Sequence, residues 1–481
     1  MKTNIRYYIY LLSLFTMPII LANYYYIDDM GRASSGYLGW GKDGRPLSDA
    51  IMYIVNIGTP ITDIAPLTVV ISIAILSLSM SKWQSFVDNN ASGFFIVASF
   101  MANPYLAENF SYRFDVLPMM AGISLAFLGF SINTRSVITK TIITVAIFIS
   151  SLATYQVNVN IICALVICEF AINAQRWPIT KSINNLLLRI SQVFISIYIY
   201  LAIILPISFN GNHVENHPGI AEKSIIRTIL NNLYDYFYFI DETFIYNFKA
   251  LICLFLLISI ISSVVIIKKV TPSKSKAYDI FFYISILSSP FLIIILCVGS
   301  LLALENTIVY FTRLYIGVSF VFIYLSICLN IIFKSIKIRF LCFLLMVFPS
   351  ISYFYTYGNA IREQSIYTKI IISQVSSIAY NELSDSNPNL FFNGSGGKSK
   401  FTINAENKYP LIKYSIPNYF RVWYWPIKAF EMNGVSVKFT TDRRDLNKNW
   451  CVDTLIKKTQ NFDVIFTENS MIVDFEKKCH Q

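Results

Sequence analysis

The sequence predicts a polytopic α-helical membrane protein that carries a small α/β domain after its last membrane span. Hydrophobic residues make up 55% of the 481 residues and charged residues only 14%, whereas soluble domains usually carry about 25% charged residues. Apolar stretches of roughly 17–25 residues, the length that crosses a bilayer core, recur up to about residue 357. We therefore expect a transmembrane domain over residues 1–357 and a separate domain over residues 358–481.

The apolar stretches predict where the membrane spans lie. They occupy residues 5–22, 61–80, 92–105, 116–133, 138–154, 158–174, 186–206, 246–267, 279–302, 313–333 and 338–357. The third stretch is short and the fourth to sixth are closely spaced. The prediction is therefore about 11 transmembrane helices.

Charged residues predict how the spans are oriented. Alternate loops carry clusters of Lys and Arg, such as those at Arg135, Arg176 and Lys334, whereas acids outnumber cations in the intervening loops. Short loops rich in Lys and Arg stay on the cytoplasmic side of a membrane. We therefore expect a cytoplasmic N-terminus and, with an odd number of spans, an external C-terminus. The net charge of +11 reflects this topology, and its scatter over helix ends argues against a nucleic-acid partner.

The last part of the chain has the pattern of a small α/β domain. Residues 363–382 have helical spacing, and a polar stretch with a glycine-rich loop at Asn393 follows. Short β-like runs then occur at Lys400–Ile403, Val435–Thr440, Val464–Thr467 and Met471–Phe475. About 120 residues are enough to bury a modest core.

Cysteine and histidine residues predict one disulfide and no metal site. Six of the eight cysteines lie in apolar spans, where they act as small packing residues. Cys451 and Cys479 lie in the predicted external domain, in a compartment where disulfides persist, so we expect them to be bridged. The three histidines, His213, His217 and His480, do not show the spacing of metal ligands.

The first external loop, residues 23–60, carries the most informative chemistry. Asp28 and Asp29 follow the first span directly, and charges at membrane depth tend to be functional. The alternative is that these acids only mark the water boundary and cap the next helix. Aromatic residues around them, including Tyr37 and Trp40, suit a membrane interface. Several glycines allow tight turns near a ligand, and Arg32 and Arg45 could hold an anion. Together these residues suit a sugar phosphate at the membrane surface.

Three motifs in the first loop and three further segments carry a resemblance to a known family. In the first loop these are Tyr-Tyr-x-Asp-Asp-x-x-Arg (25–32), Gly-Tyr-x-Gly-Trp (36–40) and Gly-Arg-Pro-Leu (44–47). Further along are Tyr-Arg-Phe-Asp-x-Leu-Pro-Met (112–119), Tyr155-Gln156 at an external turn, and Arg313 at the start of a late span. In this order they resemble the serotype-converting O-antigen glucosyltransferases of enteric bacteria and their temperate phages. The C-terminal domain is similar only in general character.

The resemblance implies a C-type membrane glycosyltransferase fold in the bacterial inner membrane. Such an enzyme would use undecaprenyl-phosphate glucose at the periplasmic face and transfer glucose, with inversion, to a sugar hydroxyl of lipid-linked O-antigen. It would need no metal or other cofactor, in keeping with the lack of a P-loop or a dinucleotide-binding motif. Its expected partners are membrane lipid, the donor, the O-antigen, a small flippase and a donor-synthesising transferase.

The resemblance also implies roles for individual residues. Asp28 or Asp29 would be the general base, and because neighbouring carboxylates can share a proton, one of them could instead orient the other. The candidates for binding the donor phosphate, in falling order, are Arg113, Arg313, Arg32 and Arg45. Arg313 could alternatively be a snorkelling residue at a helix end. The candidates for sugar and acceptor contacts are Tyr155, Gln156, Trp40, Tyr37 and Asp115, and Asp115 could instead form a structural pair with Arg113.

Two other functions are compatible with a polytopic protein that works outside the cytoplasm. An O-antigen polymerase or ligase also joins lipid-linked glycans there, but its usual bundle lacks an Asp-Asp pair after the first span. A flippase for lipid-linked sugars would predict an inverted repeat and several ionisable residues in mid-span. No such repeat is visible, and Glu169 is the one acid well inside a predicted span.

Overall fold

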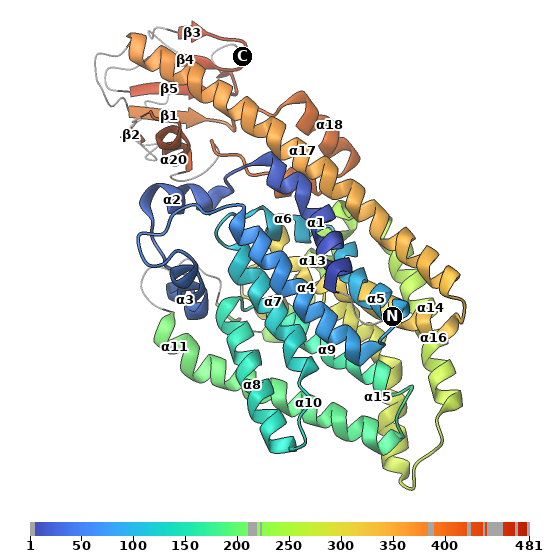
Figure 1. Cartoon of the computed structure of the whole chain (residues 1–481). Coiled ribbons are helices and arrows are strands. Elements are labelled where there is room, and N and C mark those ends of the chain that lie inside the picture. The colour runs from blue at the N-terminus through green and yellow to red at the C-terminus, as the bar shows by residue number, and fades with distance from the viewer. Residues whose placement is uncertain are drawn as a thin grey trace.

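The structure is a computed structural model of the chain, and it describes residues 5–209, 219–221, 224–382, 389–420, 425–435, 438–439, 456–466 and 470–478. A bundle of helices forms most of the molecule, and a small sheet near the C-terminus projects from one end of it (Figure 1). The expectation of a helical membrane protein with a small C-terminal sheet is therefore confirmed.

Eight helical segments in the described part of the chain are long and apolar enough to cross a membrane, so the chain is a multi-pass membrane protein. They are α1 (Ile5–Ala22), α4 (Leu67–Val87), α8 (Val137–Thr154), α10 to α11 (Ile179–Ser208), α14 (Phe248–Lys269), α15 (Lys276–Ile295), η5 with α16 (Thr312–Ile332) and α17 (Ile336–Glu382).

The other three predicted spans coincide with shorter apolar helices. These are α5 with its 3₁₀ extension (Ala91–Ala102), α7 (Val116–Ser131) and α9 (Asn158–Asn173). Nearly every side chain of α7 and α9 is buried, because longer helices surround them. All predicted spans are thus helical, and the total of about 11 membrane-crossing helices stays a prediction.

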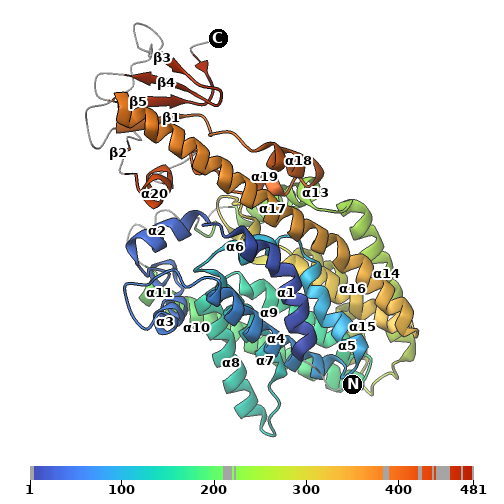
Figure 2. The ribbon, with the colours of Figure 1, turned by 45° about the horizontal axis from the view of Figure 1, so that its top comes forward.

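The last predicted span and the predicted helix at residues 363–382 are one continuous helix. The helix α17 runs for 47 residues with Pro349 inside it, which at 1.5 Å per residue is about 70 Å. Such a length exceeds the roughly 30 Å bilayer core, so α17 extends beyond the bundle and reaches the sheet (Figure 2). The domain boundary expected after residue 357 falls inside this helix.

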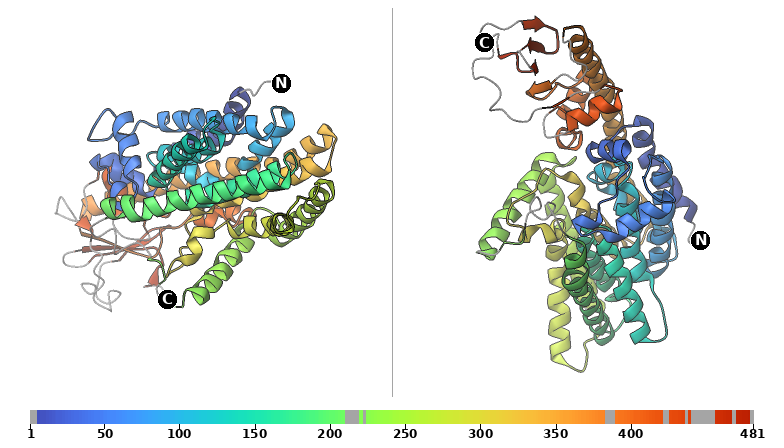
Figure 3. Two further views of the ribbon diagram at one scale, coloured as in Figure 1. Left: turned by 90° about the horizontal axis from the view of Figure 1, so that it is seen from below. Right: turned by 90° about the vertical axis from the view of Figure 1, so that its left-hand side faces the viewer.

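The C-terminal sheet has five strands in the order β2-β1-β5-β4-β3. The strands are β1 (Asn389–Asn393), β2 (Lys438–Phe439), β3 (Ile456–Lys458), β4 (Asp463–Phe466) and β5 (Ser470–Asp474). The strand β1 runs parallel to β2 and β5, whereas β3, β4 and β5 form an antiparallel meander. The sheet stands clear of the bundle in Figure 3.

The β-like runs of the sequence had mixed outcomes. The predictions at Val464–Thr467 and Met471–Phe475 are confirmed as β4 and β5, and the run at Val435–Thr440 contains the short β2. The prediction of a strand at Lys400–Ile403 is wrong, because these residues begin the helix α18 (Lys400–Lys408). Ser399 starts that helix by accepting a hydrogen bond from the Thr402 N–H at 3.1 Å.

Short helices fill the connections at one end of the bundle. They are α2 (Ile27–Ser35), η1 (Gly41–Asp43), α3 (Pro46–Val55), α6 (Leu106–Ser111), α13 (Ile225–Thr243), η4 (Gly299–Ala303), α19 (Ile412–Ser415) and α20 (Trp425–Met432). The segments predicted to lie outside the cytoplasm contact one another here, and we call this end the first-loop end. At the opposite end, Arg176 Nη1 donates to the Phe86 carbonyl at 3.0 Å, and Arg339 Nη1 donates to Ser92 Oγ at 2.7 Å.

Cys451, Cys479 and the three histidines lie outside the described residues. The disulfide between the two cysteines therefore stays a prediction.

Candidate active site

Asp29 fastens the first loop to the loop before α7. Its carboxylate is fully buried and accepts three backbone N–H groups: Tyr26 at 3.0 Å, Arg113 at 2.9 Å and Phe114 at 3.2 Å. Burial raises the pKa of Asp29 to about 8, although these donors pull in the opposite direction. Both oxygens of Asp29 thus accept hydrogen bonds from the backbone.

Asp28 has a different environment from its neighbour. The residue is half-buried, and no hydrogen bond or ion pair from the described residues reaches its carboxylate. Burial raises the pKa of Asp28, and the positive charges of Arg313, Arg32 and Arg45 act against that rise. The first loop thus contains one acid that serves as a fastener and one with free oxygens beside three guanidinium groups.

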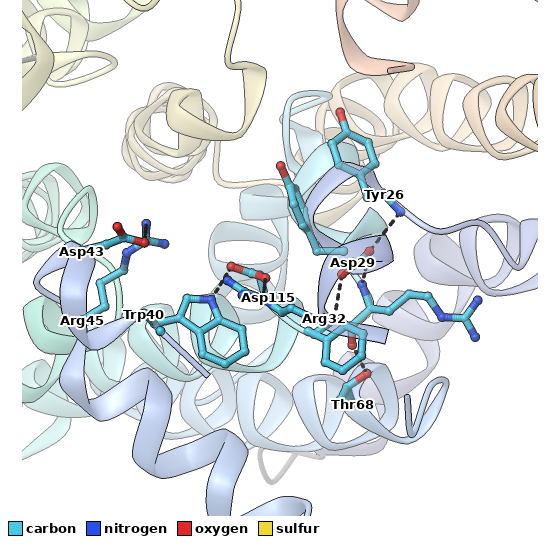
Figure 4. Close-up of polar contacts among 12 residues, drawn as sticks. Tyr26, Asp29, Arg32, Trp40, Asp43, Arg45, Thr68 and Asp115 are labelled. Carbon is cyan, nitrogen blue, oxygen red and sulfur yellow. Dashed lines mark hydrogen bonds and ion pairs between the residues drawn. The ribbon is translucent and has the colours of Figure 1, made fainter. Parts of the chain in front are cut away.

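Arg32, Trp40 and Asp115 form a closed group next to these acids (Figure 4). The Trp40 indole N–H donates to Asp115 Oδ1 at 2.6 Å, and Arg32 Nε lies 3.4 Å from Asp115 Oδ2. The Arg32 guanidinium also stacks over the Trp40 ring at 3.8 Å, with the Tyr37 ring 5.2 Å away. Arg32, Tyr37, Trp40 and Asp115 were all predicted as site residues from the sequence. The structure does bring them together, and most of the contacts described here are among the four residues themselves.

The alternative pairing of Asp115 with Arg113 is wrong. Asp115 pairs with Arg32, whereas Arg113 Nη2 pairs with Asp63 Oδ2 at 2.9 Å. The Arg113 guanidinium also bonds Asn23 Oδ1 at 2.8 Å and lies 4.2 Å from the centre of the Tyr25 ring. The backbone N–H of Arg113 faces Asp29, and its side chain turns toward the segment before α4. Arg113 and Asp115 are therefore close in sequence but have separate partners.

Asp49 shapes the first loop, and sequence reasoning did not single it out. Its carboxylate accepts the N–H groups of Gly39 and Trp40 at 2.9 Å each and that of Gly41 at 2.8 Å. A Cβ at Gly41 would lie 2.6 Å from Asp49 Oδ2, so the close approach needs glycine. The signal in the sequence was an acid in the first turn of a helix that begins with Pro46, where carboxylates often bind backbone N–H groups.

Arg45 lies where the first loop meets the turn between α8 and α9. It contacts Asp43 at 3.4 Å and lies 6.0 Å from the centre of the Tyr155 ring. Gln156 Nε2 donates to the Asp43 carbonyl at 2.5 Å, so the Tyr-Gln turn does support the first loop. The Arg45 Nε atom is buried and has no hydrogen-bond partner among the described residues.

Arg313 approaches the site from the start of η5. Its backbone N–H donates to Glu108 Oε2 at 2.7 Å, and its guanidinium lies 3.7 Å from Glu108 Oε1 and bonds the Tyr112 hydroxyl. Tyr155 donates to the Arg313 carbonyl at 3.2 Å. Glu108 is buried, which raises its pKa. No motif in the sequence singled out Glu108, because its role in positioning Arg313 depends on a contact between residues 205 positions apart along the chain.

A family model described as Glucosyl transferase GtrII matches residues 17–325, a stretch that contains every site residue described so far. The chain belongs to the GtrII glucosyl transferase family. A Salmonella phage P22 protein, described as an uncharacterized 55.3 kDa protein in the gtrB 5′ region, is 29% identical over 234 residues. The match covers 47% of each chain, so the chain spans about half the length of the curated relative it matches. No solved structure matches this fold.

The C-terminal part of this GtrII-family protein, beyond the matched residues, covers the first loop. Tyr26 donates to the Ser415 carbonyl at 2.7 Å, and Tyr419 donates to the Tyr25 carbonyl. The Tyr419 and Tyr24 rings stack with their centres 5.4 Å apart. Ser415 Oγ also lies 3.2 Å from Thr312 Oγ1, next to Arg313. The C-terminal segment thus touches the two chain regions that flank Asp28.

At the first-loop end of the GtrII-family bundle, the Asp28 carboxylate has no bonded partner among the described residues and feels the charges of Arg313, Arg32 and Arg45. Asp28 can accept a proton, and Arg313 and Arg45, at 23% and 20% exposed, have the most accessible of the four guanidinium groups for an anion. Arg32 and Arg113 are 8% and 13% exposed and pair with Asp115 and Asp63, and the buried Arg113 Nε has no hydrogen-bond partner among the described residues. This arrangement suits the transfer of a group from a phosphate to a hydroxyl.

Proposed function

We propose that this protein transfers glucose from undecaprenyl-phosphate glucose to a sugar hydroxyl of lipid-linked O-antigen. The family membership supports glucosyl transfer, and the observation that carries the proposal is the free Asp28 carboxylate beside Arg313, Arg32 and Arg45. A polyprenyl-phosphate donor supplies an anionic leaving group at the membrane surface, where those cations lie.

In the proposed reaction, Asp28 accepts the proton of the acceptor hydroxyl as that oxygen attacks C1 of the glucose. The bond between C1 and the phosphate oxygen breaks in the same step, and its electron pair leaves with the phosphate. A single displacement of this kind inverts the configuration at C1. The leaving phosphate gains negative charge, and fixed cations stabilise that charge in the transition state.

The proposal orders the four arginines by how accessible their side chains are. Arg313 is 23% exposed and Arg45 is 20% exposed, against 13% for Arg113 and 8% for Arg32, so the first two would contact the phosphate. Arg32 would hold the loop through Asp115 and Trp40, and Arg113 would hold the adjacent segment through Asp63. Tyr155, Gln156, Trp40 and Tyr37 would line or support the sugar site.

The proposed setting is the bacterial inner membrane, with the first-loop end and the C-terminus in the periplasm. The clustering of Lys and Arg in the loops at the opposite end supports this orientation. A reporter fused after Gln481 should show periplasmic phosphatase activity and no cytoplasmic fluorescence. The proposed partners also include a small flippase and a donor-synthesising transferase, which would supply the lipid-linked glucose at the periplasmic face.

The test is a reconstituted reaction. Purified protein in liposomes is given undecaprenyl-phosphate glucose carrying radiolabelled glucose, together with lipopolysaccharide, and the polysaccharide is analysed for label and anomeric configuration. We expect label on the polysaccharide with the configuration opposite to that of the donor. Transfer from UDP-glucose but not from the lipid donor would overturn the donor assignment, and retained configuration would overturn the single displacement.

A further inference from the structure

A polar cleft lies between the first loop and the C-terminal domain, on another side of α2 from Asp28. Its volume is about 180 Å³, and its lining comes from three regions far apart in the sequence. The first loop contributes Tyr25 and Met30, α17 contributes Ser365, Thr368 and Lys369, and the C-terminal domain contributes Tyr419 and Asn433. Figures 1 and 2 show how α20 and the adjoining part of α17 lie over α2.

The lining of the cleft has the chemistry of a carbohydrate site. One face of the Tyr25 ring is covered by Arg113 and one face of the Tyr419 ring by Tyr24, which leaves the second face of each ring for a sugar to pack against. The Thr368 hydroxyl and the Asn433 amide can exchange hydrogen bonds with sugar hydroxyls. Lys369 is exposed and adds one positive charge, and none of the described residues that line the cleft is Asp or Glu. The cleft therefore favours a neutral or anionic hydroxyl-rich ligand.

A second cavity on the other side of Asn23 has the opposite character. It is about 60 Å³ in volume, lies between α1 and α4, and is lined mainly by apolar residues that include Ile19, Ile20 and Val69. Asn23 contributes to both cavities. The smaller cavity is also lined by Ser111 and Arg113, whereas the cleft lies against the C-terminal domain, so the two cavities differ in their surroundings although both adjoin the start of the first loop.

We infer that the cleft between α2, α17 and α20 binds sugar residues of the acceptor polysaccharide. This inference rests on the proposed function, because the cleft borders the same short helix that carries Asp28. Met30 lines the cleft, and Asp28 is two positions earlier on α2, so a glycan held in the cleft can extend past α2 to the free carboxylate.

The two walls of the cleft also differ in their relation to the family. Tyr25 and Met30 lie inside the family match at residues 17–325, whereas Ser365, Lys369 and Asn433 lie outside it. The wall inside the family match lies on and next to the helix that carries Asp28, so it would face the reacting end of the acceptor, and the wall outside the match would face the rest of the glycan. This division assigns the choice of polysaccharide to α17 and the C-terminal domain.

A pair of neighbouring substitutions on α17 tests the inference. Ser365→Trp places a large side chain in the cleft, and Ile366→Trp places the same side chain on the exposed surface one residue further along, where Ile366 is 49% exposed. The probe is a panel of delipidated O-antigen polysaccharides from enteric bacteria, and binding to the full-length protein is measured by calorimetry. We expect Ser365→Trp to weaken binding of the recognised polysaccharide at least tenfold and Ile366→Trp to leave it unchanged.

Lys369→Ala provides a second test that adds no bulk. We expect weaker binding of an anionic polysaccharide, with recovery in Lys369→Arg.

In the transfer reaction, Ser365→Trp should raise the KM for the acceptor while the KM for the lipid donor and the slow hydrolysis of donor without acceptor stay at wild-type values. Equal binding by wild type and Ser365→Trp, or no binding of any polysaccharide by wild type, would overturn the inference. Binding that is lost in Ser365→Trp without any glucosylation by wild type would overturn the proposed function and leave the cleft as a glycan site.

Discussion

Two groups of charged residues in this protein illustrate opposite ways of burying charge. Near the end of the bundle opposite the first loop, Glu169 on α9 and Arg189 on α10 form an ion pair at 2.8 Å, and both side chains are 2% exposed. The other two guanidinium nitrogens of Arg189 also have partners: Nη1 donates to Gln192 at 3.0 Å, and Nη2 donates to the Phe130 carbonyl at 3.4 Å and to the second Glu169 oxygen at 3.3 Å. Asn185 donates to the same carboxylate at 3.1 Å.

The group around Asp28 at the first-loop end is not saturated in this way. Asp28 accepts no hydrogen bond from the described residues, Arg45 keeps a buried Nε without a partner, and Arg313 is 3.7 Å from Glu108. A saturated pair inside a membrane protein holds helices together, because breaking it leaves a buried charge. An unsaturated group beside an opening keeps its bonding capacity for a ligand. We therefore assign a structural role to the Glu169–Arg189 pair and a role in the reaction to the group around Asp28.

The sharpest test of this comparison is a pair of substitutions in the first loop. Asp28→Asn keeps the size of the side chain and removes a base, so the rate of glucosyl transfer should fall by about 10²–10⁴-fold. The thermal midpoint in detergent should stay at its wild-type value, because the carboxylate has no bonded partner among the described residues. Transfer rates and midpoints measured on the same preparations check both expectations.

Asp29→Asn is the matched control for Asp28→Asn. An amide can accept at only one of its two positions, so at least one of the three N–H groups loses its partner, which costs about 1–3 kcal/mol. We expect a lower thermal midpoint, and a transfer rate per folded molecule that falls far less than in Asp28→Asn. A wild-type rate in Asp28→Asn combined with loss of activity in Asp29→Asn would exchange the two roles.

The second test breaks the saturated pair. Glu169→Ala leaves Arg189 buried without its carboxylate, which should lower the free energy of unfolding by about 3–5 kcal/mol. The KM values for donor and acceptor of the folded fraction should not change, because the pair lies away from the first-loop end. Thermal unfolding in detergent and steady-state kinetics separate the two effects. A large change in KM with an unchanged midpoint would show that the pair belongs to the reaction instead.

The third test ranks the arginines. Arg313→Lys and Arg45→Lys keep a positive charge but lose the guanidinium fork, and we expect transfer to slow by about 10²-fold, the typical effect of losing one transition-state donor. Arg113→Ala should have a smaller effect on the rate and lower the thermal midpoint, since its guanidinium is engaged by Asp63 and Asn23. The opposite ranking would return donor binding to Arg113.

Much of this architecture could be predicted because it follows from composition along the chain. Apolar stretches have to become helices in a membrane, and each predicted span is a helix in the structure. The loops in which acids outnumber cations were expected at the same end of the bundle, and the turn at Tyr155 does contact the first loop there. The C-terminal strands β4 and β5 were visible from their alternating runs.

The remainder depended on contacts that no local pattern reveals. Asp28 and Asp29 are about 100° apart around a helix, and only the loop at residues 113–114 decides which of them receives backbone N–H groups. The partners of Asp115 and Arg113 are likewise set by segments distant in sequence. The segment at Lys400, where a strand was expected, is a helix that Ser399 caps at its N-terminus. The β-like composition of the segment outweighed this capping residue in the sequence prediction.

The smallest expected effects concern pH dependence. The pH dependence of the thermal midpoint tests Asp29, and the pH dependence of kcat/KM tests Asp28. Burial raises the pKa of Asp29 to about 8, above the unfolded value of about 3.9. Between these values the folded chain binds the additional proton, so the contribution of Asp29 to stability is present at low pH and is lost as the pH rises through about 8. In Asp29→Asn the thermal midpoint should therefore vary less between pH 5 and 8 than in the wild type.

A base has to be ionised, so the raised pKa of Asp28 should place the acidic limb of kcat/KM above the pH at which an ordinary aspartate ionises. That limb should persist at the same pH in Asp29→Asn. If the limb disappears in Asp29→Asn, or if the pH dependence of the midpoint is unchanged there, Asp29 and Asp28 titrate as a pair and the division between a fastening acid and a reacting acid fails.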